Sequence, residues 1–364
     1  MQASHKNVIQ QGKGEIQMKT YRRYLSLFVA FALVLTVLSA CSNSGGNAAS
    51  GTAGQQNDQT ASNAGDNGKA SGGKTNLILT TAGTGGAFYP IGAAMAKIVN
   101  DNEPTLNITS QASGGSVENV RLLENKEVDF AMLGGDVAVD AYQGIGDFEG
   151  ENGNFSGLFA MYEEPLSIVV PANSDIHSIS DLAGKKVAVG APGSGTEVKN
   201  KALLTALGVP YDKMKPQFIS FAESVDALKD GNIDASMVWA GIPVPSIIDL
   251  STVKDIRLIG FTEDEVKKAT EASPYLHQYV IPSGTYKGVN QDTISLSNKT
   301  QAVVRNDVDE TAVYNFVKAV FEHIDDLHVA HDSAKEITAE SAVENAIPLH
   351  PGAEKYFKEA GVIK

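Results

Sequence analysis

This chain has few of the residues that carry most enzyme and metal chemistry. Its one cysteine, Cys41, excludes a disulfide framework and a thiolate metal site. The histidines are scattered, and no H-E-x-x-H motif or carboxylate-rich calcium loop occurs. After residue 74 the only arginines are Arg121, Arg257 and Arg305, so no bidentate arginine–carboxylate clamp is evident. We therefore predict no catalytic residues, no bound metal and no cofactor.

Basic residues are also in deficit. The chain has 29 Lys and Arg against 43 Asp and Glu, which gives a formal net charge of −14. The acidic excess lies after residue 74. A body this acidic is a poor binder of nucleic acid, so we expect none as a partner.

The N-terminal region lacks an apolar run long enough to span a membrane. A basic stretch at residues 18–23 precedes an apolar run at residues 25–38, shorter than the ~20 residues a transmembrane helix needs. The run ends in Leu-Ser-Ala-Cys at Cys41, which resembles a bacterial lipobox and implies cleavage before Cys41 and lipid on its sulfur. An N-terminal membrane anchor with an incidental cysteine is the alternative.

This resemblance divides the first part of the chain into three. We interpret residues 1–17 as a mis-called extension before a true start at Met18, and 18–40 as a lipoprotein signal peptide. Residues 41–74 are rich in Ser, Gly, Asn and Ala, which is typical of a flexible tether.

Strand and helix signals alternate over the rest of the chain and predict an α/β fold. Residues 76–81, 106–111 and 128–133 read as strands separated by helices. The pattern then repeats, with strands expected at 166–171, 186–190, 217–221, 233–239 and 256–260. Two α/β units in series suggest two lobes with a ligand cleft between them.

Three glycine-rich turns each follow an expected strand and open an expected helix. They are TAGTGGAFYP at 81–90, ASGGSVEN at 112–119 and GAPGSGTE at 190–197. Such junctions aim backbone N–H groups at an anion. Ser116 is expected to be a helix N-cap, and Ser194 with Glu197 has the spacing of a capping box. Any strand–helix junction favours Gly, Ser and Thr, so a purely structural role remains open.

Two other functions of these turns find no support. None has the P-loop spacing or the full dinucleotide fingerprint. A nucleophile elbow at Ser194 would need glycine at positions 192 and 196, where Pro192 and Thr196 stand.

The three turns, together with Asp136-Val137-Ala138, Glu164-Pro165-Leu166, Gly241-Ile242-Pro243-Val244-Pro245 and Leu349-His350-Pro351-Gly352, resemble the TAXI family. These are the solute-binding receptors of tripartite ATP-independent periplasmic (TRAP) transporters. The resemblance implies a two-lobed periplasmic-binding-protein fold of type II, with residues 75–165 and 280–364 in lobe I and 166–279 in lobe II. It implies an extracytoplasmic receptor, here lipid-anchored, that delivers its ligand to TRAP permease subunits and performs no catalysis.

The resemblance also implies a small carboxylate or amino acid, such as glutamate, as ligand. We expect the anionic end to be bound by Thr84, Gly85, Gly86, Ser116, Ser194 and Thr196. Phe88, Tyr89 and Trp239 would form the walls, and Asp136 and Glu164 are candidates for binding an amine. The matched motifs add Gly115, Asn119, Gly193, Gly195 and Pro243.

This sequence departs from the family at Phe88, where many relatives carry tyrosine, and at Trp239, where a small residue is expected. Both changes put the ligand's identity in doubt. Two alternatives stay open, a receptor for an ABC importer or sensor kinase and an extracytoplasmic hydrolase that uses Ser194.

Overall fold

The computed structural model describes residues 74–150 and 153–364. All of them belong to one compact unit, Lys69–Lys364. The expected N-terminal extension, signal peptide and lipidation site, and all but the last residue of the expected tether, lie outside the described residues. Within the described residues, no helix combines the length and apolarity needed to cross a membrane.

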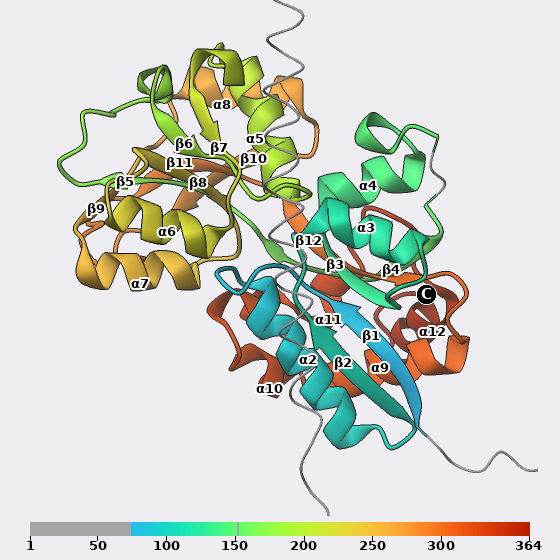
Figure 1. Cartoon of the computed structure of the whole chain (residues 1–364). Coiled ribbons are helices and arrows are strands. Elements are labelled where there is room, and N and C mark those ends of the chain that lie inside the picture. Colours follow the sequence, from blue (N-terminus) through green and yellow to red (C-terminus); the bar gives the residue numbers. More distant parts are fainter. Residues whose placement is uncertain (1–73, 151–152) are drawn as a thin grey trace, which may run out of the picture. The chain divides into compact units, whose positions relative to one another are not determined.

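Lobe I is built on a five-stranded sheet in the order β2-β1-β3-β12-β4 (Figure 1). Strands β1 (Thr75–Thr80), β2 (Leu106–Gln111) and β3 (Phe130–Gly134) are parallel, as the alternation of strands and helices predicted. Strand β12 (Lys299–Arg305) is antiparallel to β3 and to β4 (Phe155–Glu163).

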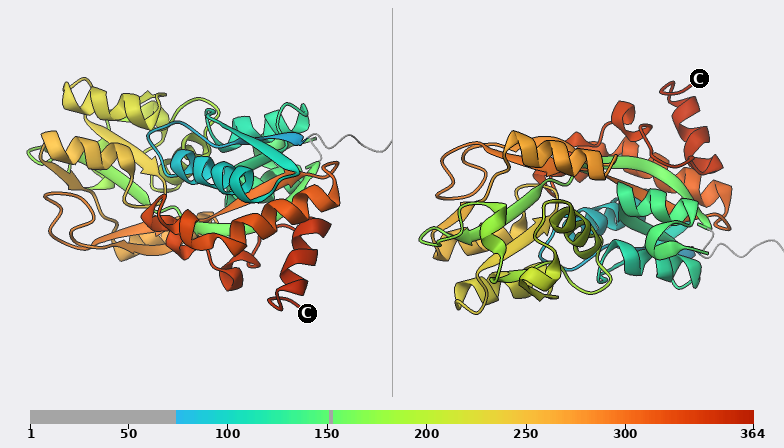
Figure 2. Two further views of the ribbon diagram at one scale, coloured as in Figure 1. Left: turned by 90° about the horizontal axis from the view of Figure 1, so that it is seen from below. Right: turned by 90° about the horizontal axis from the view of Figure 1, so that it is seen from above.

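Helices cover both faces of this sheet because each face is apolar. On one face α2 (Phe88–Asn102), α9 (Glu310–Glu322), α10 (Ile324–His328), α11 (Ala339–Ala342) and α12 (Pro351–Glu359) bury one hydrophobic cluster. On the other face α3 (Ser116–Glu124) and α4 (Gly135–Gln143) bury a second. Figure 2 shows the C-terminal helices on the lobe that carries the first strand, which agrees with the return implied by the family resemblance.

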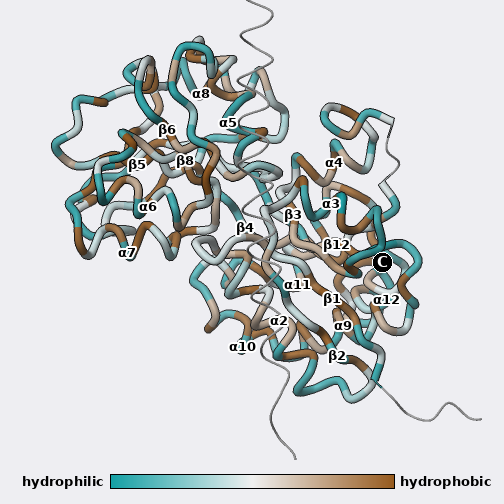
Figure 3. The backbone as a smooth tube through the Cα atoms, viewed as in Figure 1, coloured by the Kyte–Doolittle hydropathy of each residue, from teal (hydrophilic) through white to brown (hydrophobic). Residues whose placement is uncertain are grey.

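Lobe II repeats this layered design around the sheet β7-β6-β8-β5-β9. Its strands are β5 (Leu166–Pro171), β6 (Lys186–Ala188), β7 (Lys215–Gln217), β8 (Ala235–Trp239) and β9 (Ile256–Leu258). Helices α5 (Gly195–Ala206) and α8 (Glu263–Ala272) pack on one face, and α6 (Phe221–Lys229) and α7 (Pro245–Val253) on the other. In both lobes the hydrophobic residues run along the central strands (Figure 3).

Two crossings join the lobes. Strand β4 passes into β5 through Glu164 and Pro165, and β11 (Thr293–Ser297) passes into β12 through Asn298. Short 3-10 helices at Gly146–Phe148, Ile179–Leu182, Tyr211–Lys213 and Asp332–Glu336 (η1 to η4) complete the connections.

The fold class predicted from the sequence is confirmed, but the return to lobe I comes later than the expected residue 280. β10 (His277–Ile281) pairs with β11, and Ile281, Tyr286 and Val289 are buried with α6 and α7 of lobe II. Lobe I therefore resumes at Asn298. Ile281, Tyr286, Val289 and Leu296 complete the core of lobe II, which explains the difference.

Candidate ligand-binding site

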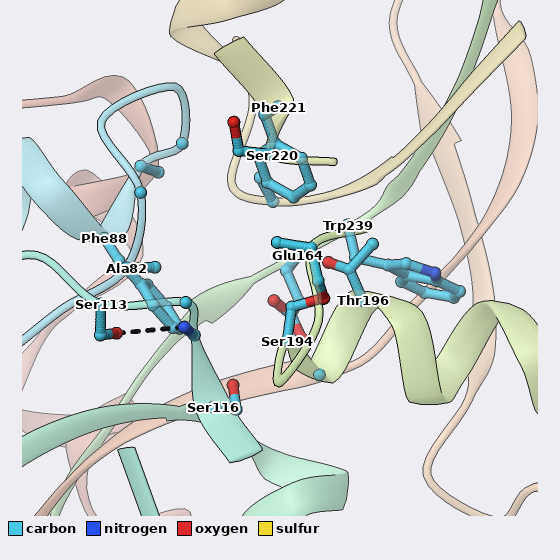
Figure 4. A pocket seen from close by; sticks show the side chains of 18 of the residues that line it. Ala82, Phe88, Ser113, Ser116, Glu164, Ser194, Thr196, Ser220, Phe221 and Trp239 are labelled. Atoms are coloured by element: carbon cyan, nitrogen blue, oxygen red, sulfur yellow. Dashed lines mark hydrogen bonds between the residues drawn. The ribbon is translucent and has the colours of Figure 1, made fainter. Parts of the chain in front are cut away.

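A cavity of about 120 Å³ lies between the two lobes (Figure 4). Lobe I contributes Ala82, Gly83, Gly86, Ala87, Phe88, Ser113, Gly114, Gly115, Ser116 and Tyr162, and the crossing contributes Glu164. Lobe II contributes Ala191, Ser194, Gly195, Thr196, Lys199, Ser220, Phe221, Trp239, Ala240 and Gly241. The three glycine-rich turns thus meet at one site, as predicted, and the start of α6 joins them.

The N-terminus of α3 approaches the site through Gly115. Gly115 is the N-cap residue and has φ 120° and ψ −160°, a conformation that only glycine adopts readily. A Cβ on Gly115 would also lie 3.3 Å from Cα of Ser194 on the other lobe. The expectation that Ser116 is the N-cap is wrong. Ser116 is the first helical residue, and its hydroxyl oxygen accepts a hydrogen bond from the Gly134 N–H at 3.0 Å.

Ser194 caps α5, as predicted, but half of the expected capping box is missing. The Ser194 hydroxyl oxygen accepts the Glu197 N–H at 3.1 Å, while the Ser194 N–H donates to the carbonyl of Ala191 at 3.1 Å. The Ser194 hydroxyl itself donates to the same carbonyl at 2.7 Å. Its proton is therefore committed, and no histidine lines the cavity. This arrangement does not activate Ser194 as a nucleophile.

The lobes touch on both sides of the cavity. The Glu118 N–H of α3 donates to the carbonyl of Gly193 at 3.0 Å, and the Ser246 N–H of α7 donates to the carbonyl of Gly85 at 3.2 Å. His331 Nε2 lies 3.0 Å from the carbonyl oxygen of Pro243. These bonds hold the two lobes against each other on either side of the cavity.

Not all of the cavity's hydroxyl groups are free to bind a ligand. Ser113 donates to the carbonyl of Thr81, and Ser220 donates to the Glu223 carboxylate. Ser194 is committed as described. Ser116 accepts a bond from Gly134, and neither its hydroxyl nor that of Thr196 donates to another residue within 74–150 and 153–364. These two hydroxyl donors therefore remain for a ligand.

A buried ionic cluster lies at one wall of the cavity. The Lys199 ammonium of α5 contacts the Glu164 carboxylate and lies 3.5 Å from Oδ1 of Asp136 on α4. Asn298 Nδ2 donates to the same Asp136 oxygen at 2.7 Å. A Cβ at residue 134 would lie 2.7 Å from that oxygen and 3.0 Å from Lys199 Nζ, so the backbone approaches closely here because residue 134 is glycine.

The cluster joins lobe I, lobe II and both crossings. One cation, Lys199, is shared by two carboxylates. The pKa of Glu164 is raised to about 7, because burial and the nearby charge of Asp136 raise it more than the charge of Lys199 lowers it. Burial lowers the pKa of Lys199, but the two carboxylates outweigh it and the net pKa is raised. Lys199 Nζ also lies 5.3 Å from the centre of the Trp239 ring.

Many of the residues expected at the site line the cavity. They are Gly86, Phe88, Gly115, Ser116, Glu164, Ser194, Gly195, Thr196 and Trp239. The remaining expected residues, Thr84, Gly85, Tyr89, Asn119, Asp136, Gly193 and Pro243, are not among the lining residues.

The residues outside the lining have other contacts. Thr84 and Tyr89 are exposed, and the carbonyls of Gly85, Gly193 and Pro243 bond the opposite lobe. Asn119 is fully buried and holds the carbonyls of Thr81 and Met132. Asp136 is in contact with Lys199 and Asn298, and its expected role as a partner of a ligand amine stays a prediction.

Sequence reasoning missed Lys199, Tyr162 and Phe221. Lys199 follows Thr196 by three residues on α5, and residues three apart lie on the same face of a helix. This spacing could have identified Lys199 from the sequence. Phe221 begins α6 directly after Ser220, whose capping box with Glu223 marks another helix start. Tyr162 lies in β4, a strand that the pattern of polar and apolar residues did not predict.

Among residues 74–150 and 153–364, no group of three or more His, Cys, Asp and Glu side chains is placed to hold a metal ion.

Three solved structures show limited similarity to this chain, and one family model matches most of it. A putative L-cystine ABC transporter protein from Listeria monocytogenes is 14% identical over 71% of this chain and 95% of its own, with a TM-score of 0.47. A methylphosphonate-bound protein from Prochlorococcus marinus is 12% identical over 79% and 99%, with a TM-score of 0.48. The periplasmic aliphatic sulphonate-binding protein of Escherichia coli is 15% identical over 78% of each chain, with a TM-score of 0.40. The family model described as NMT1-like matches residues 79–361. The chain therefore belongs to the NMT1-like family.

Proposed function

We propose that this protein is a solute-binding receptor that encloses a small carboxylate or amino acid between its two lobes. The observation that carries the proposal is the cavity between the lobes, where the N-termini of α3 and α5 meet from opposite sides. A helix N-terminus favours a negative charge, because its first N–H groups have no partner within the helix. An anion between the two helices would draw the lobes together.

The size of the cavity fits a small metabolite. A cavity needs about 10–15 Å³ to hold one water, so one of about 120 Å³ has room for about eight to twelve waters. A ligand with a similar number of non-hydrogen atoms fits that space. Phe88, Phe221 and Trp239 supply apolar walls for its carbon skeleton.

The electrostatics favour a zwitterion or a singly charged anion. Lys199 is the only cationic side chain that lines the cavity among the described residues, and two carboxylates already share it. A multiply charged anion would have no unshared cation to bind. A ligand amine has one carboxylate within reach, Glu164, because Asp136 is not in the lining.

The remaining parts of the proposal rest on the sequence. The ordered series of motifs resembling the TAXI family supports delivery of the solute to a TRAP permease. The lipobox ending at Cys41 supports a lipid anchor on the outer face of the membrane. Delivery to an ABC importer is the alternative, and a neighbouring gene that encodes fused TRAP subunits would distinguish the two.

Calorimetric titration of the full chain tests the binding function. The panel is L-glutamate, other amino acids, succinate and related dicarboxylates. We expect one-to-one binding of at least one member with micromolar affinity, and at least tenfold weaker binding by Ser116→Ala. Ser283→Ala, an exposed serine outside the cavity, is the control and should bind as the wild type does. No binding of any member at millimolar concentration would refute the proposal.

A further inference from the structure

The charges at one wall of the cavity do not balance. Lys199 is the single cation of the buried cluster, and its ammonium contacts the carboxylate of Glu164 and lies 3.5 Å from that of Asp136. With both carboxylates ionised, the cluster carries one uncompensated negative charge. Glu164 (Figure 4) and Lys199 both line the cavity, and among residues 74–150 and 153–364 they are the only lining residues with a carboxyl or amino side chain. A solute therefore meets a wall whose charge depends on whether Glu164 is ionised.

The surroundings of Glu164 act on its charge in opposite directions. Burial favours the protonated form, because the side chain is only 7% exposed, and so do the carboxylates of Asp136 on α4 and Glu163 on β4. Lys199 on α5 favours the ionised form. The balance raises the pKa of Glu164 to about 7, so both forms are populated in the ligand-free protein near neutral pH.

The other titratable side chains at this point do not supply a second cation to Glu164. His277 on β10 has its Nε2 3.0 Å from the Glu163 carboxylate, and Glu336 in η4 accepts the Glu163 N–H at 2.9 Å. Tyr162 keeps its proton, because burial raises its pKa well above its usual value. Within the described part of the chain, Lys199 is thus the one cationic side chain in contact with Glu164.

The group expected to hold the solute's carboxylate lies close to Glu164. The hydroxyl of Ser116, at the start of α3, accepts the N–H of Gly134 at 3.0 Å. A Cβ on Gly134 would lie 2.9 Å from Oε1 of Glu164, so one backbone residue lies against both side chains. A carboxylate bound at Ser116 would be the third negative charge around the single ammonium of Lys199. Charges in a buried site interact strongly, because solvent screens them little.

We propose that Glu164 adapts the site to the charge of its solute: a solute without an ammonium group is bound together with one proton, which is added to the Glu164 carboxylate, whereas an amino acid is bound by ionised Glu164, with its own ammonium in place of that proton. This inference rests on the proposed receptor function and specifies how one site accepts both ligand classes. In both cases the cluster and the solute together keep the same net charge. The proton comes from solvent on binding and returns to it on release.

The affinities of the two classes should depend on pH in opposite directions. Because Glu164 titrates at about pH 7, its protonated fraction falls about tenfold between pH 6 and 8, and its ionised fraction rises about tenfold. A monocarboxylate should therefore bind about tenfold more weakly at pH 8 than at pH 6, and an amino acid about tenfold more tightly. At pH 7 each bound monocarboxylate should take up about half a proton, and each bound amino acid should release about half a proton.

Calorimetric titration of the full chain with matched ligand pairs tests the inference. L-Leucine is paired with 4-methylpentanoate and L-glutamate with glutarate, because the members of each pair differ only in the ammonium group. Affinities are measured at pH 6, 7 and 8. The number of protons exchanged is obtained at pH 7 from titrations in two buffers of different ionisation enthalpy. Any other panel member that binds is measured in the same way, and its class follows from whether it carries an ammonium group.

Glu164→Gln distinguishes this role from a purely structural one. The amide is neutral at every pH, as protonated Glu164 is, so binding of both classes should become independent of pH. At pH 8 the variant should bind 4-methylpentanoate about tenfold more tightly than the wild type does, and L-leucine more weakly. Glu354→Gln is the control, because Glu354 lies on α12 outside the cavity lining, and it should keep the wild-type pH dependence.

The same direction of pH dependence for both classes, or no proton exchange with either, would overturn the inference and leave the receptor function standing. A Glu164→Gln protein that keeps the wild-type pH dependence would do the same. If the variant does not fold, or if only one class binds, the wild-type affinities and proton counts decide alone. If the wild type binds no member of the panel or of the pairs, the receptor function itself fails, and the inference fails with it.

Discussion

Replacement of Lys199 by methionine removes the one cation in the buried cluster. The side chains of Lys199, Asp136 and Glu164 are 5%, 11% and 7% exposed, so solvent screens them little. Removing one partner from a buried ion pair typically costs about 3–5 kcal/mol, because the remaining charge stays buried without compensation. Here two carboxylates lose their cation, although Asp136 keeps the hydrogen bond from Asn298.

The cost of Lys199→Met should depend on pH. Lys199 is the charge that holds the pKa of Glu164 down against burial, so its loss lets Glu164 take up a proton more readily. A protonated Glu164 no longer buries a charge. We therefore expect a loss of about 3 kcal/mol in the free energy of unfolding at pH 8, and a smaller loss at pH 6.

Urea unfolding followed by circular dichroism at both pH values measures these losses. Lys185→Met is the matched control, because Lys185 pairs with Asp175 at 2.7 Å on the surface of the same lobe. Exposed pairs contribute about 0–1 kcal/mol, so the control should change little. If Lys199→Met is no more destabilising than Lys185→Met at pH 8, the cluster does not stabilise the fold as argued.

Three further predictions follow from the same geometry. Because the pKa of Glu164 is raised to about 7, its stabilising contribution is fully present below about pH 4.5 and is lost as pH rises through about 7. The free energy of unfolding should fall by roughly 1 kcal/mol per pH unit over this range. Urea denaturation from pH 5 to 8 should show this slope in the wild type and a flatter one in Glu164→Gln. Gly115→Ala should destabilise the protein by about 1–3 kcal/mol and weaken binding, whereas unchanged melting and affinity would show that the φ of 120° is not required. Trp239 is the only tryptophan and lines the cavity, so a bound ligand should shift its fluorescence; a shift that fails to saturate with the calorimetric stoichiometry would place binding elsewhere.

The sequence predicted the features of the fold that local patterns determine. Gly, Ser, Thr and Pro punctuate the strand–helix junctions, and each of the three expected turns is found at the cavity. Strands β4 and β12 were not predicted. They are antiparallel neighbours buried within one sheet, where alternation of polar and apolar residues fades and periodicity carries little information.

The site's polar chemistry was less predictable because it depends on contacts between distant segments. Asp136 and Glu164 were expected to bind the amine of a ligand. In the structure both carboxylates contact the ammonium group of Lys199, which lies on lobe II. Likewise, the sequence shows that Ser194 can cap a helix, but only the backbone geometry shows that its proton is committed to Ala191. Whether the expected residues contact a ligand stays a prediction.

The most direct test of the account is a crystal structure of the protein with the tightest-binding member of the panel. The account predicts that the ligand lies between the lobes, with its carboxylate at hydrogen-bonding distance, about 2.7–3.2 Å, from Ser116 and Thr196. A ligand bound anywhere else, with this cavity holding only water, would contradict it.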